Sequence, residues 1–200
     1  MPLYTLDRPA HTIRQLSDNR SDGHRALMSI LPDNVLSEGS PRSDAALLWR
    51  VDADTLTFHS LVPPTHGATL IGDVPPIGDG DAVSCTIDIA TVTRRTVPIP
   101  QEMWDAGYRP TKKVESQIAD GDIDGWVHRT LTKHGFDVQS IDISPVAYAH
   151  LGHRRGNHRV PYVTVKFAAT VSNADEARHA MIHGIGKAKN FGLGMIITNP

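Results

Sequence analysis

Residues 160–198 read VPYVTVKFAATVSNADEARHAMIHGIGKAKNFGLGMIIT and carry the clearest folding pattern in the chain. Apolar and polar residues alternate along 160–171, which predicts a half-buried strand. A helix capped by Ser172 or Asn173 follows, and residues 195–198 form a closing strand. Strand, helix and strand in this order are the second half of a ferredoxin-like unit.

The preceding residues supply the other elements of two such units. We expect strands at residues 1–6, 46–52, 55–62, 83–92 and 138–149. Helices are expected at residues 21–31, with Ser21 or Asp22 as the N-cap and Pro32 as the stop, and at 123–133, while 63–80 holds at most a short helix. The sequence therefore predicts an α+β fold of two tandem ferredoxin-like (RRM-like) βαββαβ domains, residues 1–92 and 93–200.

The composition describes a folded chain without signals for secretion or membrane insertion. Hydrophobic residues make up 40% of the 200 residues, so the chain can bury a core. No apolar run reaches the roughly 20 residues that cross a bilayer, and the N-terminus lacks a basic stretch followed by an apolar one. We therefore expect a cytoplasmic protein with no membrane partner. Cys85 is the only cysteine, which excludes an internal disulfide and a multi-cysteine zinc site.

Charge is unevenly divided along the chain. The net charge is -2, but from Ile143 onward seven Lys and Arg residues stand against two acidic ones. An acidic front half argues against a protein that coats any nucleic acid, whereas a basic back half suits a localised phosphate-binding face. Ordinary scatter of surface charge is the alternative interpretation.

A glycine-rich segment lies between the last predicted helix and the last strand. It contains Gly184, Gly186, Gly192 and Gly194 together with Lys187 and Lys189. Glycines let the backbone bend tightly and approach a phosphate, whose charge the lysines and exposed N–H groups would meet. A dinucleotide site is excluded because Lys189 stands where the third glycine is needed, and a Walker A loop because Ala188 follows Lys187. The alternative is a connection that merely needs glycines.

His24 is the candidate for proton transfer, on the first predicted helix. Cleavage of a phosphodiester by a nucleophile within the substrate needs only proton transfers and charge stabilisation at the phosphate. One histidine with nearby cations can supply both. In the first turn of a helix, the positive end of the dipole would favour the neutral imidazole. Since the chain has eleven histidines, an exposed or capping role is the alternative.

Two further groups of basic residues are candidates for RNA contact. Residues 150–159 form a basic hairpin tip suited to phosphate contact, with the candidates His153, Arg154, Arg155, His158 and Arg159. A zinc site of His150, His153 and His158 is disfavoured because flanking arginines would repel the ion. A possible RNA path, or simply linker charge, is formed by Arg94, Arg95, Lys112 and Lys113.

Together these landmarks resemble the CRISPR repeat-processing endoribonucleases. Residues 184–195 are similar to their C-terminal signature G-h-G-x-x-K-x-x-G-x-G-h, where h is apolar. The places of His24, of the short apolar stretch and proline after it, and of the basic hairpin are similar to the CasE branch of type I-E systems. Ser21 departs from that pattern, because the better-known members have a tyrosine there, and a tyrosine-assisted mechanism loses its basis.

The resemblance implies an endoribonuclease that needs no metal or other cofactor. It would recognise the CRISPR repeat stem-loop and cleave on its 3′ side by 2′-hydroxyl attack, leaving a 2′,3′-cyclic phosphate or a 3′-phosphate. It would then keep the guide RNA as a subunit of the type I-E complex, Cascade. Two alternatives stay open: a catalytically silent subunit that caps the guide RNA, and an unrelated tandem ferredoxin-like protein such as a small-ligand sensor.

Overall fold

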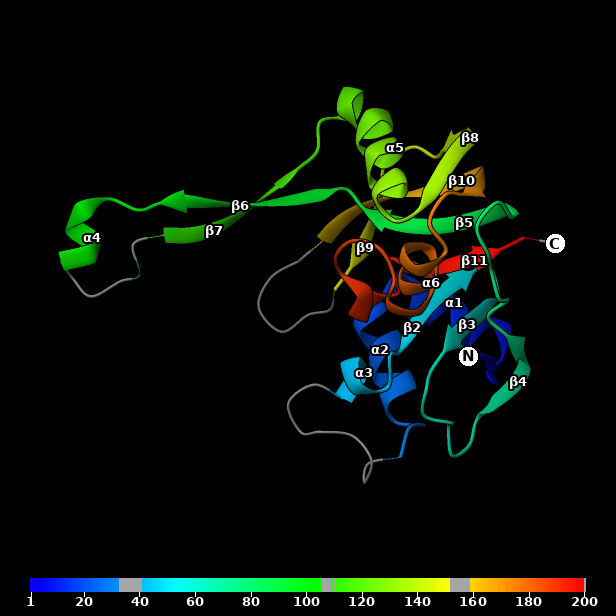
Figure 1. The fold of residues 1–200 in the computed structure, drawn as a ribbon. Coiled ribbons are helices and arrows are strands. Elements are labelled where there is room, and N and C mark those ends of the chain that lie inside the picture. The colour runs from blue at the N-terminus through cyan, green and yellow to red at the C-terminus, as the bar shows by residue number, and fades with distance from the viewer. Residues whose placement is uncertain (33–40, 106–108, 110, 152–158, 200) are drawn as a thin grey trace.

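The computed structural model describes residues 1–32, 41–105, 109, 111–151 and 159–199. Within these residues the strands form a four-stranded sheet, a five-stranded sheet and a two-stranded arm, all antiparallel (Figure 1). Each of the two larger sheets buries one face against helices, and each has its own apolar core. The chain is therefore built from two α+β units.

The first unit covers the N-terminal third of the chain. Its elements are β1 (Pro2–Leu6), α1 (Ala10–Asp18), α2 (Arg20–Met28), α3 (Pro41–Asp44), β2 (Leu48–Asp52), β3 (Thr55–His59) and β4 (Ala68–Asp73). The sheet order is β2-β3-β1-β4, and α1 and α2 cover the face that carries Trp49 and Phe58. Both aromatic side chains are fully buried.

The second unit repeats this order of strands. Its elements are β5 (Ala82–Ala90), the 3-10 turn η2 (Asp120–Asp122), α5 (Ile123–Lys133), β8 (Phe136–Ile143), β9 (Ala147–His150), β10 (Arg159–Val171), α6 (Ala174–His183), the 3-10 turn η3 (Lys189–Phe191) and β11 (Ile196–Thr198). The sheet order is β11-β5-β10-β8, with β9 paired to β10. With β9 left out of the count, the first strand of each unit lies between the third and the fourth, which is the ferredoxin-like arrangement. The predicted fold class is confirmed.

A long arm leaves the second unit between β5 and α5. It consists of β6 (Val92–Pro98), α4 (Gln101–Asp105) and β7 (Thr111–Gln117), and Figure 1 shows it projecting far from both sheets. An isolated two-stranded ribbon buries little apolar surface, and most of its side chains are exposed. Most of the arm therefore stands outside the two apolar cores.

Several predicted elements are confirmed, and their signals were local. The helix at 123–133 and the strand at 160–171 are α5 and β10. Asn173 caps α6, because its side-chain oxygen accepts from the N–H groups of Asp175 and Glu176, both at 3.1 Å. The predicted hairpin is β2 and β3, whose register ends at Asp52 opposite Thr55.

Other expectations were wrong for elements whose structure depends on residues far away in the sequence. No helix was expected at α1, although Ile13 and Leu16 are one helical turn apart and both buried. Residues 68–73 form the edge strand β4 and not part of a short helix, because pairing with β1 supplies its hydrogen bonds. The strand at 83–92 was assigned to the first unit, but β5 pairs with β10 and β11 of the second. We propose that the domain boundary lies between residues 73 and 82 and not at 92.

One buried histidine joins the two units. His59 on β3 is completely buried, and its Nε2 lies 3.1 Å from the carbonyl oxygen of Met181 on α6, to which it donates. Burial lowers the pKa of His59 from 6.5 to about 4, although the Met181 carbonyl works in the opposite direction. The neutral ring is therefore the form that the folded protein holds.

None of the described helices is long and apolar enough to cross a bilayer.

Substitution of His59→Gln is expected to reduce the loss of stability on acidification. The unfolded chain takes up a proton on His59 near pH 6.5, whereas the folded chain does so near pH 4, so the free energy of unfolding falls as the pH drops below 6.5. Between pH 7 and pH 5 this loss is about 2 kcal/mol. Urea unfolding at both pH values measures it, and glutamine keeps an N–H donor for Met181. Equal pH dependence in both proteins would contradict this role.

Candidate nucleic-acid interface

His24 lies in the second turn of α2 and is half-buried. The helix begins at Arg20 and is preceded by Asn19 as its N-cap residue, so the predicted cap at Ser21 or Asp22 was wrong. The side chain of Asn19 makes no cap bond to a backbone N–H group; its amide donates to the Asp22 carboxylate at 2.6 Å. His24 therefore lies beyond the first turn, where the helix dipole expected to act on it is weaker.

Trp49 joins the helix of His24 to the glycine-rich segment. A Cβ added to Gly23 on α2 would lie 2.5 Å from the Trp49 ring, and one added to Gly192 would lie 2.7 Å from it. The ring Nε1 donates to the carbonyl oxygen of Asn190 at 3.2 Å. The indole is thus enclosed between α2 and the segment, and it fixes one against the other. We name this arrangement the Trp49 sandwich.

The glycine-rich segment folds tightly on itself. Gly184, Gly186, Gly192 and Gly194 all have φ between +71° and +85°. A Cβ on Gly194 would lie 2.3 Å from the Ile185 carbonyl oxygen, and its N–H donates to the Asp88 carbonyl at 2.6 Å. Of the four glycines only Gly186 is exposed. The segment needs the other three for its own packing, so their contact with RNA remains a prediction.

The two lysines of this segment have different surroundings. Lys189 donates from Nζ to the Gly184 carbonyl oxygen at 2.8 Å and so stabilises the end of α6. Lys187 places its Nζ 3.8 Å from Glu115 Oε1 on the arm. Burial lowers the pKa of Lys187, while the Glu115 carboxylate counteracts this shift. Lys187 therefore connects the segment to the base of the arm.

The predicted RNA path lies on the arm. All four of its cations are exposed: Arg94, Arg95, Lys112 and Lys113. Arg94 donates twice to Glu115, at 3.0 Å and 2.5 Å, and these bonds lower the pKa of that carboxyl. Glu115 thus neutralises cations from both the arm and the glycine-rich segment, a role that the sequence did not reveal.

A cavity of about 460 Å³ lies where these parts meet. The arm contributes Arg94 and Glu115, and the glycine-rich segment contributes Lys187 and η3. Because η3 also packs against α2, this basic cavity lies next to the helix that carries His24. The structure thus brings together three of the predicted groups: the histidine helix, the glycine-rich segment and the arm.

The predicted basic hairpin is described only at its base. His153, Arg154, Arg155 and His158 lie outside the described residues. Arg159 begins β10, and its guanidinium carbon lies 5.2 Å from the ring centre of Tyr148. Tyr148 is 46% exposed and was missed from sequence, although an aromatic residue just before a basic stretch was a usable signal. The pair offers a flat cationic surface at the base of the hairpin.

No cluster of three or more metal-ligating side chains occurs among the residues that the structure describes. Of the three histidines in the disfavoured zinc arrangement, only His150 is among them.

The Trp49 sandwich predicts that alanine lowers the stability of the protein at one helical glycine and raises it at another. Gly23→Ala forces a methyl group into the indole and is expected to destabilise the protein by about 1–3 kcal/mol. Gly125→Ala, on α5, meets only the flexible end of Arg129 at 3.2 Å and is expected to be stabilising by up to about 1 kcal/mol. Chemical denaturation measures both. Similar effects at the two sites would argue against the sandwich.

Solved structures with the same fold match essentially the whole chain. Thermus thermophilus Cse3, bound to an RNA that represents a pre-cleavage complex, has a TM-score of 0.70 and 18% identity over 100% of this chain and 98% of that one. Cas6e from Escherichia coli K-12 has a TM-score of 0.68 and 17% identity over 100% of both chains. A chain of a CRISPR RNA-guided surveillance complex has a TM-score of 0.61 and 18% identity, with coverage of 99% and 98%.

The family assignment rests on the sequence and agrees with this shared fold. No curated protein sequence matches the chain. A family model described as CRISPR associated protein matches residues 3–200, which confirms the resemblance found in the sequence. The chain therefore belongs to the family of CRISPR-associated proteins.

Proposed function

We propose that this chain is an endoribonuclease that cuts CRISPR repeat RNA without a metal ion and then remains bound to its product. One observation carries the proposal: the helix of His24 is held by Trp49 against a glycine-rich segment that borders a basic cavity at the base of the arm. A histidine beside cations is the minimum set for cleavage by an internal nucleophile. The proposal agrees with the shared fold of Cse3, whose structure contains bound RNA.

The reaction needs two proton transfers and no external nucleophile. A base removes the proton of the 2′-hydroxyl, the 2′-oxygen attacks the adjacent phosphorus, and the bond to the 5′-oxygen breaks. The leaving 5′-oxygen takes up a proton, and the other product carries a 2′,3′-cyclic phosphate, which can open with water to a 3′-phosphate. We assign a proton transfer to His24 and stabilisation of the charged phosphate to neighbouring cations such as Lys187.

The RNA stem would lie along the basic surfaces that border this site. We assign stem contacts to the arm, with Arg94, Arg95, Lys112 and Lys113, and to the basic hairpin, with His153, Arg154, Arg155, His158 and Arg159. Gly184, Gly186, Lys187, Lys189, Gly192 and Gly194 would shape or contact the RNA backbone. Tyr148 can stack on an unpaired base, since base stacking on an aromatic ring contributes roughly 1–3 kcal/mol. These contacts would give binding that weakens steeply with salt.

The protein would act within a larger assembly. One chain of a CRISPR RNA-guided surveillance complex shares its fold along nearly its whole length. We propose that this chain keeps the guide RNA and joins the other subunits of a type I-E complex.

A guide-capping subunit without catalysis is the second candidate. Ser21 favours this candidate, because the better-known CasE members have a tyrosine at this position. The site therefore has one side chain fewer that could transfer a proton. An unrelated tandem ferredoxin-like protein is excluded by the family match.

Loss of His24 is expected to abolish cleavage and spare binding. His24→Ala should slow single-turnover cutting of the cognate repeat RNA in EDTA by roughly 10²–10⁴-fold, the usual contribution of a proton-transfer group. His11→Ala, an exposed histidine on the neighbouring α1, is the matched control and should cut at the wild-type rate. Gel-based cleavage assays and filter binding on the same RNA measure both quantities.

Two results would decide against this assignment. Tight binding without cutting by the wild-type protein would favour the guide-capping subunit, and unchanged cleavage by His24→Ala would remove His24 from the mechanism.

Removal of the Glu115 carboxylate is expected to strengthen RNA binding. Glu115→Gln frees Arg94 and Lys187 for phosphates, so affinity at low salt should rise several-fold, and the plot of log K against log salt should steepen by about one unit. Glu176→Gln removes an equal charge from an exposed position on α6 and is the control. An equal gain in both variants would indicate a general charge effect and no specific role of Glu115.

A further inference from the structure

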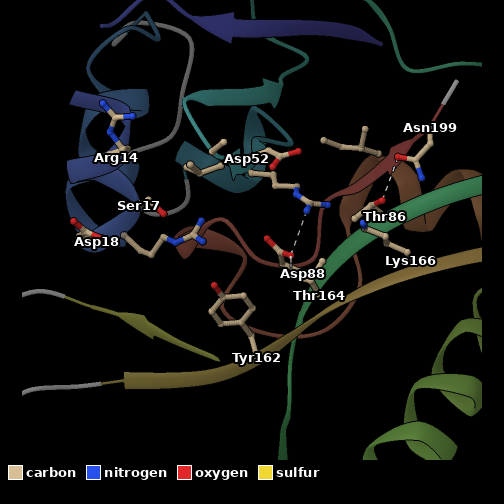
Figure 2. Close-up of a pocket in the computed structure, with 15 residues that line it drawn as sticks. Arg14, Ser17, Asp18, Asp52, Thr86, Asp88, Tyr162, Thr164, Lys166 and Asn199 are labelled. Atoms are coloured by element: carbon tan, nitrogen blue, oxygen red, sulfur yellow. Dashed lines mark hydrogen bonds and ion pairs between the residues drawn. The ribbon is translucent and has the colours of Figure 1, made fainter. Parts of the chain in front are cut away.

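A second cavity, of about 690 Å³, lies between the two units. The first unit lines it with α1, the start of α2 and β2, and the second with β5, β10 and β11. Figure 2 shows Arg14 and Ser17 on one side, and Asp88, Thr164 and Tyr162 on the other. Its volume lies within the range typical of small-molecule sites. Neither His24 nor the arm lines this cavity.

Arg20 is buried beside this cavity, and one of its guanidinium nitrogens has no hydrogen-bond acceptor among the described residues. The residue is only 3% exposed, and its Nη1 is fully buried with no hydrogen-bond partner among the described residues. The guanidinium carbon lies 5.7 Å from the Trp49 ring centre and 5.9 Å from that of Tyr162. Aromatic rings compensate a cation only partly, so a buried guanidinium with an unused N–H group favours an anion.

Arg50 adds a second buried guanidinium. It is 8% exposed, and its Nε is buried without a partner in the part of the chain that the structure describes. Its Nη2 lies 3.6 Å from Asp88 Oδ1, an oxygen that also accepts from the Thr164 hydroxyl at 2.7 Å. Among the residues that line the cavity, two guanidinium groups and the single carboxylate of Asp88 are buried, which leaves one positive charge in its interior.

The charges at the entrance balance one another. Arg14 and Lys166 are exposed there, and so are Asp18 and Asp52. Exposed carboxylates are well hydrated and screened, so they affect a bound ion weakly compared with the two buried guanidinium groups. The attraction for an anion therefore lies in the interior, at Arg20 and Arg50.

We propose that this cavity binds a phosphate group, held by Arg20 and Arg50 with the Tyr162 hydroxyl as a further donor. Guanidinium forks match the oxygens of a phosphate, and two of them suit its charge of nearly -2. The cavity is larger than a phosphate ion alone requires, so it has room for the nucleoside part of a nucleotide as well. The phosphate can belong to a free nucleotide or to an RNA chain. The residues of this phosphate site are not those of the proposed cleavage site, so phosphate binding does not depend on RNA cleavage.

A bound phosphate would also act on the helix of His24. Arg20 lies one turn before His24 on α2, and its guanidinium faces the ring of Trp49. A ligand that anchors Arg20 would therefore stabilise α2 against the Trp49 sandwich.

Calorimetric titration with 5′-AMP and with inorganic phosphate tests the site. The wild-type protein is expected to bind AMP with one site per chain. Arg20→Gln should weaken this binding at least tenfold, and Tyr162→Phe, which removes only a hydroxyl, should weaken it several-fold. Lys133→Gln, an exposed charge on α5, is the control and should bind as the wild type does. The melting temperature should rise with phosphate in the wild type and in Lys133→Gln but not in Arg20→Gln.

Repeat RNA distinguishes the two sources of the phosphate. Displacement of AMP by RNA would place an RNA phosphate in the cavity, whereas simultaneous binding of both would indicate a separate nucleotide site. Absence of AMP and phosphate binding by the wild-type protein would overturn the proposal, and so would equal binding by wild type, Arg20→Gln and Tyr162→Phe.

Discussion

The Trp49 sandwich is the contact on which the rest of the site depends. A single indole, fully buried, separates the helix of His24 from the glycine-rich segment, and both sides approach it so closely that only glycine fits. The segment in turn holds Lys187 beside the arm, so the position of the histidine relative to the basic cavity follows from one aromatic ring. Such close packing transmits small displacements, since protein interiors have few voids to absorb them.

Buried polar contacts join the two units. Arg50 approaches Asp88, and His59 donates to the Met181 carbonyl, all four residues being buried. Buried polar groups contribute little net stability but strongly disfavour arrangements in which they lose their partners. We infer that these contacts fix the orientation of the units and thereby shape the cavity between them. The same geometry leaves Arg20 and Arg50 with more donors than acceptors, which is the origin of the proposed phosphate site.

Sequence patterns predicted the elements whose signals are local and missed those that distant partners decide. The Asn173 cap and the alternation along β10 needed only neighbouring residues. Pairing of β5 with β10 depends on residues between 72 and 88 positions apart, and no local pattern reveals it. The spacing of the glycines identified the segment, but not that Trp49 is the reason for Gly192. Glu115 and Arg20 were overlooked because an exposed acid and an arginine look ordinary until their partners are known.

The effect of Trp49→Phe on catalysis and binding tests the central claim most directly. Phenylalanine keeps an aromatic ring in the core but removes the N–H bond to Asn190 and part of the contact with Gly23 and Gly192. If the sandwich positions His24, single-turnover cleavage of repeat RNA should slow at least tenfold, while affinity for the same RNA stays within about twofold because the arm is untouched. A cleavage rate equal to that of the wild type, or a loss of affinity as large as the loss of rate, would contradict the account.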